Sequence, residues 1–359
     1  MAFDKTQDTY AGRTDAWHSF GYVNPNGNLL TFDDLIENTD LGREFRKEQR
    51  TNKYTDEPIR SWDVLRDDNI WIATVGERQH ILSVQEAFGE ADAMLREVLG
   101  AEAIYDTGGT LEHGAKRWAL ASVGEFNVLG LDPMKKFLAL MDSVDATHPF
   151  KIVPTNVRIV CRNTYSATLR EDATYSRKHT KGAGEDIKAK MEQITRALVA
   201  GNQQADEFND LAQRSIQATE ARNIIRQLFG IKPDVIEDDI PTVTKNRITN
   251  VFDLFEKNDD NAFPQFRGTA WNLLNAVSEY TDHEIDVRLS GAKSSLGYTA
   301  DTARQYNALF GTGADIKAKA LDIILEQTAN APRVNGLKSF SFSNQPSNLL
   351  DAILTEAGH

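Results

Sequence analysis

The apolar positions divide the chain into a stretch dominated by strands and a later stretch dominated by helices. Short runs rich in β-branched and aromatic residues predict strands at 70–75, 101–107, 116–123, 137–143 and 150–153. Apolar residues recur at helical spacing from Ser83 to Gly100, and the spacing is mainly helical after residue 184. We therefore expect an α+β fold: a small antiparallel β-sheet with packed helices, followed by a mostly helical C-terminal half.

Turn residues between the strand-like runs favour a meander. Gly108-Gly109 predicts a hairpin turn, and Asp132-Pro133 predicts a turn before the strand that begins at Phe137. Thr31 is expected to cap a short helix through Ile36. The stretch 42–60 is dense in charge and is expected to lie at the surface without regular structure.

These patterns predict five segments. In chain order they are an irregular N-terminal segment (1–60), an α+β core with an antiparallel sheet (61–182), a long helix or helical hairpin arm (183–230), a helical C-terminal region (231–330) and a polar tail (331–359). The arm carries a heptad-like seam at Ile187, Met191, Ile194, Leu198, Ala205, Phe208 and Ala212, with Gly201 and Asn202 at its middle. The seam fits packing on its own domain and contact with another subunit equally well.

The composition of the 359-residue chain is that of a globular protein, with 40% hydrophobic and 26% charged residues. No apolar run approaches the roughly 20 residues that span a bilayer, so no membrane partner is expected. The polar start does not resemble a secretory signal, and the single cysteine fits a reducing compartment. We expect a cytoplasmic protein.

Charge singles out residues 154–181. The whole chain has a formal charge of −13, whereas this segment has six basic residues against Glu171 and Asp172, so 6 − 2 gives +4. A basic strip that also carries amide and aromatic groups is where a polyanion would bind an acidic protein. The candidate nucleic-acid contacts are Arg158, Arg162, Asn163, Tyr165, Arg170, Arg177, Lys178 and Lys181.

The secondary structure of this strip is ambiguous. A helix from Thr155 would place Arg158, Arg162 and Tyr165 on one face. A strand would instead place Val157, Ile159 and Cys161 on one face. The helix is favoured, because residues 163–169 continue with helix-compatible spacing. The plainer alternative to a binding site is a helix whose cationic face is simply solvated.

The search for catalytic chemistry finds no constellation, so an enzyme is not expected. The seven histidines are not at metal-ligand spacing, and no phosphate-loop motif occurs, since Gly311-Thr312-Gly313 has the wrong spacing to Lys317. No metal and no cofactor are therefore expected. Asp106-Thr107-Gly108 has the Asp-Thr-Gly pattern of aspartic proteases, but a single copy would need a homodimer, and a hairpin turn explains it better. Cys161 is expected to be a small buried residue.

Three motifs resemble the phage/plasmid-like DUF932 family. They are AWHSFG at 16–21, VRIVCRNT at 157–164 with His179-Thr180 downstream, and GTAWNLLNAV at 268–277 followed by Glu279-Tyr280. The Cys-Arg-Asn-Thr core is the most specific, and the likeness extends from about residue 11 to 325. The family is largely uncharacterised, so the resemblance supplies no catalytic residues. It implies a protein of mobile elements that acts in the host cytoplasm.

Two functions follow as hypotheses. The first is a nucleic-acid-binding accessory of phage recombination or replication, such as a Rad52-like single-strand annealing protein. Three antiparallel strands followed by a helix, about 103–169, would match the order of elements in such proteins, which bind single-stranded DNA as homo-oligomers. The alternative is an acidic protein-interaction or anti-defence factor that binds a host protein and no DNA. Fold alone does not decide between them.

Overall fold

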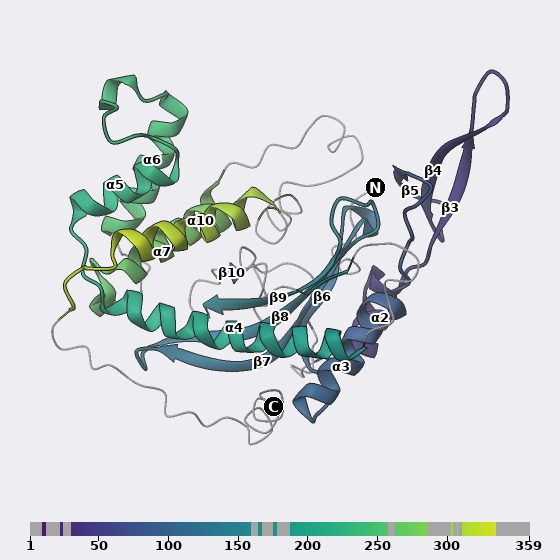
Figure 1. The fold of residues 1–359 in the computed structure, drawn as a ribbon, viewed down its shortest axis with the longest axis horizontal. Coiled ribbons are helices and arrows are strands. Elements are labelled where there is room, and N and C mark those ends of the chain that lie inside the picture. Colours follow the sequence, from purple (N-terminus) through teal and green to yellow (C-terminus); the bar gives the residue numbers. More distant parts are fainter. Residues whose placement is uncertain are drawn as a thin grey trace.

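The protein is described by a computed structural model covering residues 9–11, 22–23, 30–158, 164–166, 175–177, 187–257, 263–285, 303, 307 and 311–334. The fold is α+β, with the sheets in the N-terminal half and helices in the C-terminal half, as expected (Figure 1). The helices are α2 (Phe32–Asn38), α3 (Glu90–Leu99), α4 (Ile187–Gln213), α5 (Ala218–Leu228), α6 (Thr242–Lys257), α7 (Ala270–Glu279) and α10 (Thr312–Gln327).

The large sheet is built around an antiparallel meander. Its strands are β1 (Thr9–Ala11), β2 (Tyr22–Val23), β6 (Tyr105–Leu111), β7 (Lys116–Val128), β8 (Asp132–Ser143), β9 (Phe150–Arg158), β10 (Thr164–Ser166) and β11 (Tyr175–Arg177). They lie in the order β10-β9-β8-β7-β6-β1-β2, and β11 also pairs with β9. Only β1 and β2 run parallel; the other pairs in this sheet are antiparallel.

Side chains from both faces of the large sheet are buried, which explains why its strands read as nearly continuous apolar runs. On one face, Ala119, Leu138 and Ile152 form a core with residues of α2, α3 and the first half of α4. Helix α4 runs across this face (Figure 1). On the opposite face, a separate cluster contains Trp118, Leu120, Phe137, Ala139, Met141, Val153 and others.

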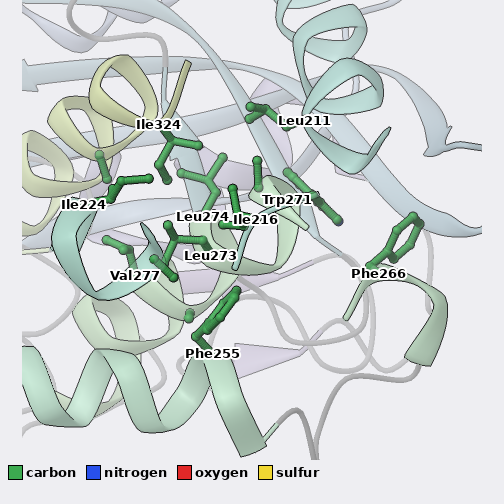
Figure 2. Packing of buried hydrophobic residues seen from close by; sticks show 14 of the residues in the cluster. Leu211, Ile216, Ile224, Phe255, Phe266, Trp271, Leu273, Leu274, Val277 and Ile324 are labelled. Carbon is green, nitrogen blue, oxygen red and sulfur yellow. The ribbon is translucent and has the colours of Figure 1, made fainter. Parts of the chain in front are cut away.

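The helical half has its own core, centred on α7. Every residue from Ala270 to Ser278 is buried, because α5, α6, α10 and the second half of α4 surround this helix. Figure 2 shows Trp271, Leu274 and Val277 among the residues packed at its centre. The same cluster includes Phe126 and Met134, from the ends of β7 and β8, so the sheet and the helical half share one continuous core.

A second, three-stranded sheet projects from the body at the far end from α5 and α6 (Figure 1). It consists of β3 (Phe45–Thr51), β4 (Pro58–Arg66) and β5 (Trp71–Val75), paired in that order and antiparallel. Its base packs on the body through a small cluster around Val64, Val75 and Val144. All ten residues from 51 to 60 are exposed.

Several local predictions are confirmed. Thr31 caps α2 through a capping box, in which its side chain accepts from the amide of Asp34 and the Asp34 carboxylate accepts from the amide of Thr31. Helix α3 ends at Gly100, whose φ of 62° is the left-handed geometry that favours glycine at this position. The region 231–330, expected to be helical, contains α6, α7 and α10.

The helix predicted from Thr155 is wrong. Residues 150–158 form strand β9, and 164–166 form β10, which pairs with 155–157 of β9. The alternation of Val157 with its polar neighbours was therefore the correct signal. Arg158 and Tyr165 consequently lie on neighbouring strands, and the helix face that would have brought them together does not exist.

Two predicted turns are also wrong. Gly108 and Gly109 lie inside β6, paired with Ala119 and Trp118, and the chain turns later through a 3-10 helix at Glu112–Gly114. Pro133 lies inside β8, opposite Asn127, and the chain turns at Leu129 and Gly130. Residues 45–51 and 58–60, expected to be irregular, belong to β3 and β4; only their exposure was anticipated.

The seam of the predicted arm faces its own chain. Helix α4 is unbroken at Gly201 and Asn202, and α5 follows after a short connection. Ile194 and Leu198 pack in the core beside the sheet, whereas Ala205, Phe208 and Ala212 pack in the helical core. Of the two interpretations, packing within the chain is therefore correct for these residues. Within the described part of the chain, no helix is long and apolar enough to cross a membrane.

Candidate nucleic-acid interface

Three of the predicted contact residues lie in the described parts of the basic strip, on β9, β10 and β11 at the outer edge of the large sheet. Arg158 ends β9, where it is paired with Met134 of β8. Tyr165 of β10 is paired with Asn156, and Arg177 of β11 is paired with Phe150. Strands β10 and β11 therefore lie one after the other along the same side of β9. Tyr165 and Arg177 are thereby placed on strands next to β9, the strand that ends at Arg158.

The other predicted contacts lie outside the described residues. They are Arg162, Asn163, Arg170, Lys178 and Lys181, as is Cys161. Arg162 and Asn163 belong to the connection from β9 to β10, and Arg170 belongs to the connection from β10 to β11.

Strand β8 adds two lysines beside the end of β9. Lys135 and Lys136 are consecutive and therefore point to opposite faces of the sheet. The Nζ of Lys135 lies 2.9 Å from Oδ2 of Asp106, so its charge is paired. The Nζ of Lys136 donates to Oδ1 of Asn202 in α4, at 2.8 Å.

Lys136 is half-buried beneath α4, and this burial lowers the pKa of its ammonium group, although nearby Asp206 opposes the shift. A cation that is partly desolvated gains more from an approaching anion than one that is fully hydrated. This lysine is therefore a second source of positive potential at the end of β9, which the sequence pattern alone did not single out.

A buried amide pair fixes β9 to α4 close to Arg158. The Nδ2 of Asn156 donates to Oε1 of Gln204 at 2.6 Å, and both side chains are buried. Within the described part of the chain, Oδ1 of Asn156 has no hydrogen-bond partner. Because a buried polar group without a partner costs about 1–3 kcal/mol, the pair orients the strand more than it stabilises it.

At the opposite end of β9, a charged cluster closes the loop between β8 and β9. Nζ of Lys116, on a side chain that is 1% exposed, lies 2.5 Å from both carboxylate oxygens of Asp145 and also contacts Oγ1 of Thr147. Burial alone would raise the pKa of Asp145, but the charge of Lys116 and the hydrogen bonds together hold it below its ordinary value.

His148 lies in the same loop. Burial lowers its pKa first of all, and the charges of Lys116 and Lys151 lower it further, against the opposing charge of Asp145. The backbone amide of His148 donates to Oγ of Ser143, which in turn donates to the carbonyl of His148. These contacts tie the loop to itself, and this accounts for the cluster without a catalytic role.

Two other motifs are accounted for by the fold. Asp106 lies within β6 and is paired with Lys135, so the Asp-Thr-Gly sequence is part of a strand. At the start of α10, the Oδ1 of Asn307 accepts from Oγ1 of Thr312 and from the amide of Gly313, each at 3.0 Å. This helix terminus is therefore capped by a side chain. In the ranges that the structure describes, no group of His, Cys, Asp and Glu is arranged to hold a metal ion.

Comparison with known proteins places the chain in a family. Residues 72–306 match the family described as "Domain of unknown function (DUF932)". The chain belongs to the DUF932 family. No curated protein matches it, and no solved structure does. The matched range runs from β5 to a point just before α10, so it includes the large-sheet meander, the basic outer edge and α4 to α7.

Sequence reasoning missed the buried ion pairs of this DUF932 chain. Arg117 and Asp142 face each other across β7 and β8 and are both 0% exposed. Lys317 of α10 lies 2.6 Å from Asp282, which belongs to the π-helical turn Tyr280–Glu284 after α7. The sequence carries little signal for the first pair, because Arg117 follows Lys116 at the start of β7 and Asp142 precedes Ser143 at the end of β8, where polar residues are ordinary.

Proposed function

We propose that this DUF932 protein binds single-stranded nucleic acid along the outer edge of its large sheet, as an accessory of phage recombination or replication in the host cytoplasm. One observation carries the proposal. The segment 154–181, with a net charge of +4 in a chain of −13, supplies the second half of β9 and both short strands, β10 and β11, that pair with it. A local excess of cations in an acidic chain suits a linear polyanion.

The order of elements supports an annealing role by analogy. Antiparallel strands β6, β7, β8 and β9 are followed by the short strands β10 and β11 and then by the long helix α4, which packs across one face of the sheet. The expected β-β-β-α order over about 103–169 is therefore wrong in detail, because more than three strands come first and the helix that packs on the sheet begins at residue 187. The analogy concerns topology alone, and the charge of the edge is the independent argument.

The proposed roles are simple. Arg158, Arg162, Arg170, Arg177, Lys178 and Lys181 contact phosphates; Tyr165 stacks on a base and Asn163 donates to one. Lys136, at the end of β9, adds to the field. Because phosphate contacts dominate such binding, we expect weak dependence on sequence and strong dependence on salt.

The test is fluorescence anisotropy of a labelled oligothymidine titrated with the full chain at several salt concentrations. We expect Arg158→Ala with Arg162→Ala to weaken binding at least about tenfold at low salt. The plot of log K against log salt has a negative slope, and each lost phosphate contact reduces its magnitude by about 0.7. The double variant should therefore show a slope smaller in magnitude by about 1.4. A matched control is Arg78→Ala with Lys232→Ala, which removes two exposed cations from other elements.

An unchanged affinity and slope in the edge variant would show that the contacts lie elsewhere. Absence of binding by the unaltered chain would refute the proposed function itself. In that case the acidic protein-interaction or anti-defence hypothesis becomes the better one, supported by the −13 charge and by the pairing of Lys135 with Asp106. Recovery of a host nuclease with the tagged chain, without DNA, would then support it.

A further inference from the structure

The pairing of the outer strands decides which face of the large sheet carries the candidate contacts. Residues paired across an antiparallel ladder project from the same face of the sheet. The contact positions in the described strands are paired as follows: Arg158 with Met134, Tyr165 with Asn156, and Arg177 with Phe150. The register therefore places all three positions on the face from which those three partners project.

That face is the one that helix α4 covers. The Nδ2 of Asn156 donates to Oε1 of Gln204 in α4. Phe150 belongs to the core that includes Leu198 of α4, and Met134 belongs to the core that includes the second half of this helix. Helix α4 also contacts β11. The three candidate positions on β9, β10 and β11 thus share one face with a helix.

Lys136 of β8 belongs to the same face. It is paired with Asn156 in the ladder, and its Nζ donates to Oδ1 of Asn202 in α4 at 2.8 Å. Among the described residues it forms no ion pair, although Asp206 of α4 lies near it. Candidate cations from β8, β9 and β11 are therefore placed on the α4 face.

The opposite face of the same strands differs in charge. Lys151 of β9 is paired with Met141 and Lys135 of β8 is paired with Val157, and both partners belong to the cluster on that face. The ammonium group of Lys135 is paired with the carboxylate of Asp106. Lys151 is therefore a cation of β9 that projects away from α4.

Helix α4 has one side toward the outer edge of the sheet. Gln204 bonds to β9 and Asn202 bonds to β8, so the side of Gln204 is the one nearer to the edge. At roughly 100° per residue, Arg196 lies about 80° around the helix axis from Gln204 and about 120° from Asn202. Arg196 is therefore on the outer-edge side of α4.

Arg196 is a cation that the fold does not use. Its side chain is exposed, and among the described residues it forms no ion pair. The neighbouring Leu198 packs in the same core as Ile152, and β11 is paired with 150–152, so this part of α4 lies beside β11. About three turns further along, Glu207 lies on the same side, where its carboxylate disfavours a phosphate.

We propose that the nucleic acid lies on the α4 face of the outer edge, and that Arg196 is a further phosphate contact, supplied by the helix beside β11. Strands and helix then hold the ligand from two sides, with Arg177 on one and Arg196 on the other. The inference rests on the proposed nucleic-acid binding, to which it adds a face and a second element. A ligand on the opposite face would meet Lys151 instead.

Salt-dependent anisotropy with a labelled oligothymidine and the full chain tests the assignment. We expect Arg196→Ala to weaken binding at least about threefold at low salt and to reduce the magnitude of the salt slope by about 0.7, as the loss of one phosphate contact does. Arg196→Lys keeps the charge and should keep the slope. The matched control is Lys151→Ala, which removes a cation from the opposite face and should leave affinity and slope unchanged.

Photo-crosslinking gives a second readout that does not depend on affinity. Gln203 is exposed and lies seven residues after Arg196, so it is on the same side of α4. A photo-reactive amino acid at position 203 should cross-link to the bound oligonucleotide, whereas the same amino acid at position 151 should not. Circular dichroism of each variant checks that the fold is unchanged.

The failures of the two proposals are distinguishable. An unchanged salt slope in Arg196→Ala, an equal loss in Lys151→Ala, or cross-linking from position 151 in place of 203 would overturn the α4 face. In each of these cases, weaker binding by Arg158→Ala with Arg162→Ala would still support binding at the edge. No binding by the unaltered chain would refute the proposed function, and the assignment of the face with it.

Discussion

At the scale of single residues, the most consequential pair is Arg117 and Asp142, which no water reaches. The Nε of Arg117 donates to Oδ2 of Asp142 at 2.9 Å, and its Nη2 donates to the carbonyl of Leu82 at the same distance. The guanidinium also lies 5.8 Å from the ring centroids of Phe45 and Phe88. One side chain thus joins the large sheet to the hairpin base and to the π-helical turn before α3.

We predict that Asp142→Asn lowers the free energy of unfolding by about 3–5 kcal/mol, because Arg117 is then a buried charge without its counter-ion. Replacing both partners by apolar residues, Arg117→Met with Asp142→Leu, should cost much less, since no charge stays buried. Urea denaturation measures both. The control is the exposed ion pair between Arg46 and Glu48, both in β3. Glu48→Gln should lower the free energy of unfolding by less than about 1 kcal/mol. Equal losses in the single and double variants would contradict this account.

At the scale of elements, Gly108 shows why a strand was mistaken for a turn. Close packing requires glycine at position 108. A Cβ there would lie 3.0 Å from Cδ1 of Leu35, 3.1 Å from the carbonyl oxygen of Trp118 and 3.2 Å from the Cα of Ala119. Two of these neighbours are backbone atoms of the paired strand, so they cannot move aside. The sequence shows a pair of glycines but not the reason for them.

We predict that Gly108→Ala destabilises the protein by about 1–3 kcal/mol, as overpacking does in a core. Gly76→Ala is the matched control, because a Cβ there meets nothing within 4 Å. It should be neutral or slightly stabilising, by up to about 1 kcal/mol, through the unfolded state. Thermal unfolding of the two variants measures both changes in stability. Equal changes would mean that the atoms around Gly108 move aside to accommodate the added Cβ.

The elements that the sequence predicted well are those with a local cause. Thr31 and Asp34 form a capping box within four residues, and Gly100 ends α3 by its own conformation. The β3–β4 hairpin was missed because its residues are mostly exposed on both faces, so no alternation of apolar and polar positions marks it. The end of β9 was misassigned because its pairing with β8 is set by residues some twenty positions away.

At the scale of the whole molecule, the sheet and the helical half are joined by a contact 139 residues apart in sequence. The Nε1 of Trp271 donates to Oδ2 of Asp132 at 3.0 Å, and both residues are fully buried. Phe208 stacks between this region and the sheet, with ring centroids 4.8 Å from Trp271 and 6.4 Å from Phe126. Two halves that read as separate segments in the sequence therefore share their core.

We predict that Trp271→Phe lowers stability by about 1–3 kcal/mol, because a buried carboxylate loses a donor, and that it does so in both halves together. Hydrogen exchange measured by mass spectrometry should show equal loss of protection in peptides from β8 and from α7. Trp71→Phe, at a side chain that is 48% exposed, is the control. Loss confined to α7 would mean that the halves unfold independently.

The candidate site was predictable only in part, for a reason of scale. The net charge of residues 154–181 follows directly from the sequence, and the sequence also allowed the possibility that the start of this segment forms a strand. That β10 and β11 share one side of β9, or that Lys136 of β8 lies beside its end, depends on pairings between distant segments. Charge and composition mark which residues belong to a site, whereas tertiary pairing decides which of them become neighbours.

Pro154, in the middle of β9, has a consequence for solubility. It lies between the residues that pair with β11, 150–152, and those that pair with β10, 155–157, so the last strand of the sheet is divided into two short pieces. Proline has no amide hydrogen to offer, and a short, interrupted edge is a poor template for strands of other chains. This edge of the sheet is thereby a poor site for edge-to-edge aggregation.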